Sequence, residues 1–262
     1  MRPLRGTLAV GARVVRLEGW LSARSPRVQA AGDTLARLEV VAVVIAAAQG
    51  FLHLLHIYVL DYAVPELNAD ADASIAGWIG TAGTGAAALA AGWLALTMTR
   101  RRAPLAVLAV VLAYLSVDDM LALHERITVS DGTVGPIEHA ARLLWPLLYL
   151  PVLALAFVVM WFLVDNAPRS IMGTLRAGLL MLVAAVLLEA ASPLIFMAGF
   201  DHGYLVYESE VVLEEGLESA GWILVAGALV AVISTTEPPA GRGRNPRSGM
   251  WFLIARDRGT DS

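Results

Sequence analysis

The chain has 262 residues, of which 58% are hydrophobic and only 16% are charged, and its formal net charge is −4; this is too apolar for a soluble domain and indicates an integral membrane protein. The absence of cysteine excludes disulfides, thiolate metal sites and cysteine nucleophiles. All nineteen basic residues are arginine, so the absence of lysine excludes Schiff-base chemistry and with it a retinal protein.

Six stretches of the chain are long and apolar enough to cross a hydrocarbon core of about 30 Å, which takes about 20 helical residues. In chain order they lie near Leu38–Leu60, Ser74–Met98, Pro104–His124, Leu143–Val164, Met172–Phe196 and Tyr204–Ile233. The sequence therefore predicts an all-α polytopic membrane protein, a bundle of about six transmembrane helices. We expect one membrane domain over 38–236, a basic tail or interfacial helix over 1–37, and a disordered tail over 237–262.

The arginines predict how the bundle is oriented. They gather before the first span, between the second and third, at the start of the fifth and after the sixth, whereas most acidic loop residues lie in the opposite loops. Loops rich in arginine stay in the cytoplasm. We therefore expect both termini to be cytoplasmic and the protein to be a multi-pass component of a bacterial inner membrane. The expected partner is the lipid bilayer, and no nucleic acid is expected.

The sixth span is unusual because it carries five glutamates within eleven residues, while no arginine or lysine occurs between Arg176 and Arg242. The five are Glu208, Glu210, Glu214, Glu215 and Glu218. At about 100° per residue they fall within an arc of about 160°, opposite a face suited to packing that includes Gly216 and Ala220. We interpret Glu208 and Glu210 as interfacial residues near the outer surface. The other three lie deeper, where a carboxylate needs a proton, a cation or a hydrogen-bond donor.

Three other spans are predicted to bring polar side chains to the same outer half of the bilayer. They are His53 and His56 of the first span, Ser116, Asp118, Asp119 and His124 of the third, and Glu189 of the fifth. The two histidines of the first span fit either hydrogen-bonded packing residues or ligands. The glycine-rich second span is interpreted as a packing helix without chemistry.

A membrane-embedded metal site is the favoured hypothesis. Mixed carboxylate and imidazole ligands suit iron, manganese or zinc. The candidate ligands are His124, Glu189, Glu214, Glu215 and Glu218. A metalloenzyme acting on a lipophilic or extracytoplasmic substrate would then use Asp118 or Asp119 as a general base and Ser116 as a donor. The Glu-x-x-His signature of di-metal carboxylate bundles does not occur in the chain.

Two alternatives stay open. Acids and histidines that follow one another through a membrane are typical of proton relays, so the protein could be a proton- or cation-coupled transporter. No acid or histidine continues below Glu218 on the sixth span, however, and this favours a closed vestibule. The remaining alternative is a non-catalytic accessory protein whose acids are protonated or hydrogen-bonded.

Two segments resemble known groups of proteins. SVDDMLALHE (Ser116–Glu125) and LEEGLESAG (Leu213–Gly221) are similar to S-x-D-D/E…H-E and E-E-x-x-E patterns in a loose group of uncharacterised bacterial multi-pass proteins. That resemblance covers under a tenth of the chain and implies no particular activity. The Ser, Asp and His of the third span also resemble the alkaline ceramidase and progestin-receptor-like hydrolase superfamily, which implies a multi-span bundle with a zinc site. This chain departs from that pattern because its sixth span has glutamates and no histidine pair.

Overall fold

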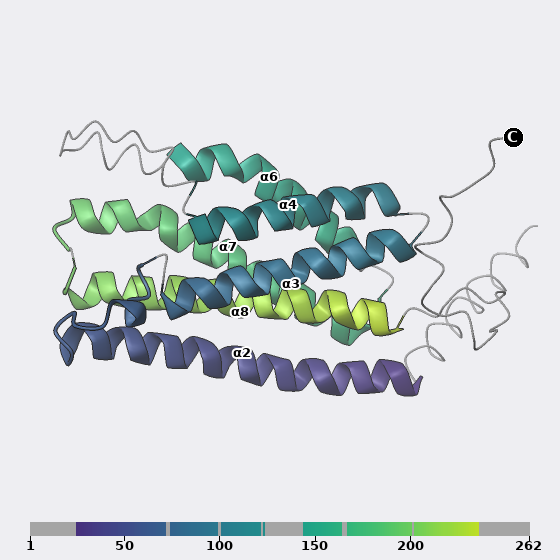
Figure 1. Cartoon of the computed structure of the whole chain (residues 1–262), viewed down its shortest axis with the longest axis horizontal. Helices are drawn as coiled ribbons and strands as arrows, with labels where there is room; N and C mark the ends of the chain where they lie inside the picture. Colours follow the sequence, from purple (N-terminus) through teal and green to yellow (C-terminus); the bar gives the residue numbers. More distant parts are fainter. Residues whose placement is uncertain are drawn as a thin grey trace, which may run out of the picture.

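A computed structural model describes residues 25–71, 74–98, 101–121, 123, 144–163, 167–200 and 202–235, with the side chains of 144–149 excepted. Six long helices run along the long axis of the molecule (Figure 1). They are α2 (Pro26–Tyr58), α3 (Ile75–Thr97), α4 (Arg102–Leu121), α6 (Leu144–Leu163), α7 (Arg169–Met197) and α8 (Leu205–Thr235). A short 3-10 helix, η1 (Pro65–Leu67), lies between α2 and α3. The described part of the chain contains no strand, so the all-α prediction is confirmed.

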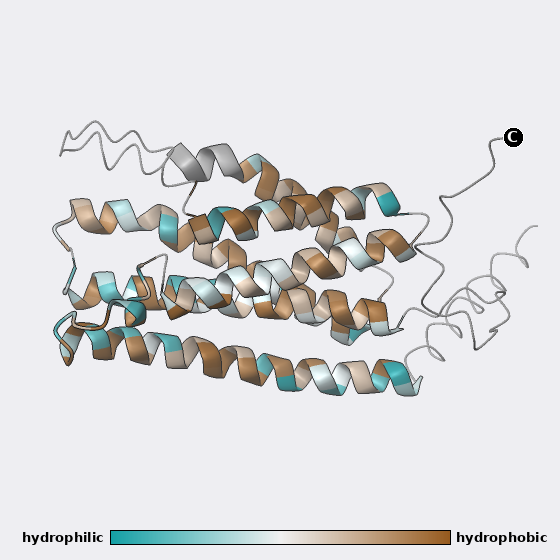
Figure 2. Ribbon diagram, in the orientation of Figure 1, coloured by the Kyte–Doolittle hydropathy of each residue, from teal (hydrophilic) through white to brown (hydrophobic). Residues whose placement is uncertain are grey.

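Five of these helices, α2, α3, α4, α7 and α8, are long and apolar enough to cross a membrane. In α6 the segment Leu150–Leu163 is apolar but shorter. Apolar residues dominate the middle of the helices, and polar residues gather toward several helix ends (Figure 2). The helices therefore have the composition of a multi-pass membrane protein.

Helix α2 begins twelve residues before the span predicted at Leu38. The Ser25 hydroxyl caps the helix by accepting a hydrogen bond from the Val28 amide at 3.2 Å, and Pro26 occupies the first turn, where its missing N–H costs nothing. The hydropathy pattern marks only the part of a helix that lies in hydrocarbon, so it missed this polar first third.

Helix α8 is the centre of the bundle because it packs against α2, α3 and α7. Its predicted packing face is confirmed, and α2 is the partner. A Cβ at Gly216 would lie only 3.4 Å from the Cβ of Ala46, and Ala220 packs with Ala42 in a buried cluster. The largest apolar core lies where α3, α4, α7 and α8 approach the arginine-bearing end, and it includes the fully buried side chains of Leu94, Leu105, Leu175, Val225 and Leu229.

The crossing of α7 and α8 depends on two glycines that face each other. A Cβ added at Gly178 would lie 2.9 Å from the carbonyl oxygen of Gly221, and one added at Gly221 would lie 3.0 Å from the carbonyl oxygen of Gly178. A side chain at either position would push backbone against backbone. This close approach sets the distance between the two helices that carry Glu189 and the five glutamates.

We predict that Gly178→Ala destabilises the protein by about 1–3 kcal/mol, because the new methyl group overpacks the α7–α8 crossing. Thermal unfolding in detergent measures the effect. Gly173→Ala is the matched control on the same helix, since a Cβ there has no neighbour within 4 Å, and it should be neutral or slightly stabilising. Equal unfolding temperatures for both variants would contradict the prediction.

Candidate functional site

A buried histidine–glutamate pair closes the loop end of the bundle. His53 Nε2 lies 2.7 Å from Glu208 Oε2, and both side chains are almost fully buried. The Ala69 amide donates to His53 Nδ1 at 3.0 Å, so Nε2 carries the ring hydrogen and donates it to Glu208. The Gly203 amide donates to the other oxygen of Glu208 at 2.6 Å. The pair thus ties α2 and α8 to the two loops that precede α3 and α8.

This arrangement corrects the interpretation of Glu208 and Glu210 as interfacial residues. Their exposed fractions are 1% and 5%, and the described loop residues Ala69 and Gly203 lie over the start of α8. Burial of Glu208 is tolerated because both of its oxygens accept hydrogen bonds from fixed donors. The open question about His53 is also answered, since both of its ring nitrogens are engaged and it acts as a packing residue.

A group of six carboxyl groups, here called the acidic cluster, lies deeper between α4, α7 and α8. The charged groups that act most strongly on Glu214, Glu215 and Glu218 are other carboxyl groups. Glu214 interacts with Glu189 and Glu210, and Glu215 interacts with Glu218 and Asp119. The members of the acidic cluster are Asp119, Glu189, Glu210, Glu214, Glu215 and Glu218.

Helix α3 forms one wall of the acidic cluster, although the sequence indicated only a packing role for it. The position of a Cβ at Gly80 lies 3.6 Å from Asp119 Oδ2 and 3.8 Å from Glu218 Oε1, so both carboxyl groups approach the bare backbone of Gly80. The Thr81 hydroxyl donates to Asp119 Oδ2 at 2.6 Å. The other face of α3 does pack as predicted, because Gly83 lies against Trp222.

Hydrogen-bond donors reach the acidic cluster unevenly. Trp222 Nε1 donates to Glu218 Oε1 at 3.2 Å. By contrast, neither oxygen of Glu210 makes a hydrogen bond of good geometry to another described residue, although Ser192 and Glu214 lie beside it. This part of the cluster is therefore short of positive partners, which is costly for a buried carboxyl group.

The predicted metal ligands are brought together only in part. Glu189, Glu214, Glu215 and Glu218 all belong to the acidic cluster, whereas His124 lies outside the described residues. Within the described ranges no three Asp, Glu or His side chains converge closely enough to hold a metal ion. Coordination would require these carboxyl groups to change rotamer and draw together.

The predicted catalytic residues of α4 have different surroundings. The Ser116 hydroxyl donates to the Thr81 carbonyl oxygen at 3.0 Å and fastens α4 to α3. Asp119 faces the acidic cluster, while Asp118 is 4% exposed in the α4 packing surface. Their roles as base and donor stay a prediction.

The loop before α3 supplies one further acid at the entrance. Asp70 accepts from the Tyr207 hydroxyl at 3.3 and 3.4 Å and lies 3.7 Å from His202 Nδ1. Burial raises the pKa of Asp70, and the nearby His202 and Tyr207 offset this only in part. Charge on Asp70 also acts on Glu210, so the acids continue from the loop into the bundle.

Several of these residues escaped the sequence analysis. Thr81, Trp222, Tyr207 and the hydrogen-bonded pair Gln49–Ser219, at 3.1 Å, are uncharged and occur at ordinary helical positions. For Thr81 no signal in the sequence singles it out. For Gln49, its place within the otherwise apolar or small stretch Val40–Leu52 of the first span was an available signal.

Comparison with known proteins gives a family without an assigned role. The family described as a domain of unknown function (DUF8692) matches residues 37–232. No curated protein and no solved structure matches the chain. The matched range contains every residue of the acidic cluster and both members of the His53–Glu208 pair.

We predict that Glu208→Gln destabilises the protein by about 1–3 kcal/mol. The amide can accept from either His53 or Gly203 but presents its NH₂ group to the other donor, and His53 cannot change tautomer without losing the bond from Ala69. Thermal unfolding in detergent is the measurement. The exposed Glu66→Gln is the matched control and should leave the unfolding temperature unchanged. An equally small effect at Glu208 would contradict the role of the pair.

The raised pKa of Asp70 predicts a pH dependence with a definite sign. The folded state holds this proton more tightly than the unfolded chain, so the protonated carboxyl favours the fold and this contribution is lost as pH rises through the raised pKa. Asp70→Asn should therefore stabilise the protein relative to the wild type increasingly from pH 4 to pH 8. Unfolding temperatures across that range test it, with the exposed Asp61→Asn of the same loop as control. A gain that shrinks with pH would contradict it.

Proposed function

We propose that this chain, which belongs to the DUF8692 family, is a membrane protein that binds cations in the acidic cluster. The observation that carries the proposal is the mutual proximity of Glu214, Glu215 and Glu218, whose strongest charged neighbours are further carboxyl groups. Two unit charges 4 Å apart repel by about 4 kcal/mol at an effective dielectric constant of 20. Several ionised carboxylates therefore require cations between them.

The cation that best fits the donor set is a divalent metal, with protons holding the same carboxyl groups when no metal is bound. Oxygen donors suit manganese or iron, and zinc would gain from an imidazole such as that of His124. Glu189, Glu214, Glu215 and Glu218 are the proposed ligands.

Binding in this manner couples metal to protons, because carboxyl groups must lose protons to become ligands. The site would take its cations from the loop end of the bundle, where Asp70 and Glu210 lead to it. A lipophilic or extracytoplasmic substrate meeting the bound metal would make the protein a metalloenzyme. The described side chains support cation binding more directly than any particular reaction.

We predict that purified protein binds close to one manganese or iron(II) ion per chain and releases protons as it does so. The double substitution Glu215→Gln/Glu218→Gln should weaken binding more than tenfold and should remove the rise in unfolding temperature that bound metal gives the wild type. Elemental analysis and calorimetry in two buffers of different ionisation enthalpy measure the metal and the protons. Glu66→Gln is the control and should behave like the wild type.

Absence of both metal binding and proton release in the wild type would overturn the metal proposal. It would favour the second candidate, proton-coupled transport, which rests on the uninterrupted sequence of interacting acids from Asp70 through Glu210, Glu214 and Glu215 to Glu218. That candidate requires pH-driven flux in liposomes that Glu214→Gln abolishes. The apolar core beyond Glu218 weighs against it, because Glu39 of α2, a described acid in that half, is an exposed residue that accepts from the Thr174 hydroxyl at 2.6 Å.

A further inference from the structure

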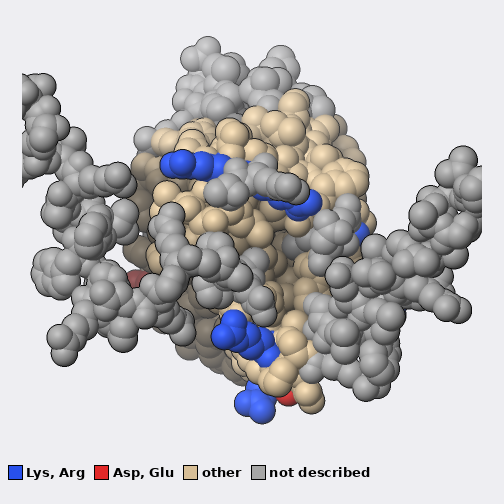
Figure 3. Space-filling view, turned by 90° about the vertical axis from the view of Figure 1, so that its right-hand side faces the viewer, with Lys and Arg blue, Asp and Glu red and all other residues tan. Residues whose placement is uncertain are grey.

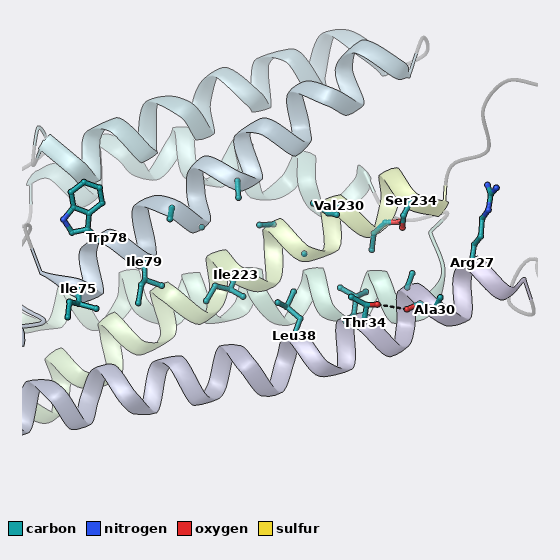
Figure 4. A pocket seen from close by; sticks show the side chains of 18 residues that line it. Arg27, Ala30, Thr34, Leu38, Ile75, Trp78, Ile79, Ile223, Val230 and Ser234 are labelled. Carbon is teal, nitrogen blue, oxygen red and sulfur yellow. Dashed lines mark hydrogen bonds between the residues drawn. The ribbon is translucent and has the colours of Figure 1, made fainter. Parts of the chain in front are cut away.

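A second site lies outside the acidic cluster, in a groove between α2 and α3. Both helices pack on α8, and between them they leave a hollow of about 1020 Å³ whose floor is formed by α8 (Figure 4). None of the cluster's acidic residues lines it. Its walls are apolar, including Leu38, Ile79, Ala86, Ile223 and Val230. The groove is therefore a separate feature that the proposed cation site does not explain.

Among the described residues that line the groove one is charged, and it lies at the end of the groove. Arg27 lines the mouth at the arginine-bearing end of the bundle, and its side chain is exposed (Figure 4). The two hydroxyl groups nearby are satisfied within their own helices: Thr34 donates to the Ala30 carbonyl oxygen at 2.8 Å and Ser234 to that of Ala231 at 2.9 Å. The groove thus offers an apolar channel with a guanidinium at its opening.

On α2 and α8 the lining of the groove is about as long as one leaflet of a bilayer, and on α3 the lining continues to Ile75, the first residue of that helix. The part of α2 that lines it extends from Arg27 to Leu38, and the part of α8 extends from Ile223 to Ser234. At about 1.5 Å per residue each length is about 16 Å, close to half of a hydrocarbon core of about 30 Å. An acyl chain that enters along the groove therefore has its headgroup at the level of Arg27.

The surrounding charge favours an anionic headgroup. Viewed from this end, the molecule presents several arginine side chains and few acidic ones (Figure 3). Arginine forms bidentate hydrogen bonds with phosphate. A headgroup without net charge is attracted to these arginines less strongly than an anionic one.

We propose that the α2–α3 groove is a binding site for one anionic phospholipid, with an acyl chain along α8 and the phosphate on Arg27. The proposal is independent of the cation site, because it uses other residues and another end of the bundle. It concerns a lipid held in a defined place, in contrast to the lipids that surround any membrane protein without preference.

Native mass spectrometry on detergent-purified full-length protein tests the site, with phosphatidylglycerol and phosphatidylcholine as probes. The wild type should bind one phosphatidylglycerol more tightly than phosphatidylcholine. Arg27→Gln should weaken phosphatidylglycerol binding about fivefold, the equivalent of about 1 kcal/mol for a basic residue at an anionic surface, and should weaken binding of the zwitterionic phosphatidylcholine less. Arg102→Gln, an exposed arginine at the same end, is the matched control.

A second variant tests the channel itself. Ala86→Trp places a large side chain in the groove from an exposed position of α3, so it should abolish the single tight phospholipid without lowering the unfolding temperature. Ala113→Trp, at an exposed position of α4 outside the groove, should leave lipid binding as in the wild type. Equal binding of the two lipids, or unchanged binding in Ala86→Trp, would overturn the proposal. So would a loss of dimers in Ala86→Trp, because a second copy of the chain would then fill the groove.

Discussion

The structure is organised by the need to bury the acidic face of α8. A carboxylate in a low-dielectric interior must meet a donor, a cation or a proton, and α8 brings no basic residue of its own. A helix with five such side chains cannot turn that face to lipid, so it lies at the centre of the bundle with α2, α3 and α7 around it. The small residues of its opposite face, Gly216 and Ala220, allow α2 to approach closely and complete the enclosure.

The five glutamates of α8 differ in their hydrogen-bond partners. Glu208 is fully satisfied by His53 and by the Gly203 amide, and its charge is held in place as part of the fold. Glu214 and Glu215 meet mainly other carboxyl groups, and Glu210 lacks a well-placed donor among the described residues. The contrast is the physical reason for assigning structure to Glu208 and cation binding to the deeper group.

The two proposed sites divide the bundle along its length. The acidic cluster lies toward the loop end, where the polar residues of four helices gather, and the apolar core and the Arg27 mouth of the α2–α3 groove lie toward the arginine-bearing end. Tight helix contacts make this division sharp. The Gly178–Gly221 approach and the contact of Gly83 with Trp222 leave little room for water between the two halves. Between Glu218 and the arginine-bearing end the helices are therefore closely packed. This packing suits a binding site at the loop end better than an open path through the bundle.

The sequence by itself determined the helical membrane architecture, because uninterrupted apolar length is a local property that each span carries alone. It also identified the acidic face of α8 and the packing face opposite, since both follow from helical periodicity along one segment.

Only the tertiary structure decided which acids find partners. His53 lies 155 residues from Glu208 in the chain, and Thr81 lies 38 residues from Asp119. Periodicity fixes where a side chain sits on its own helix, but not which neighbouring helix it meets, how that helix is rotated, or which loop amide closes over it. Hydrogen bonds need that placement to within a few tenths of an ångström, and so the distinction between a glutamate with fixed donors, such as Glu208, and one that lies mainly among other carboxyl groups belongs to the packed bundle.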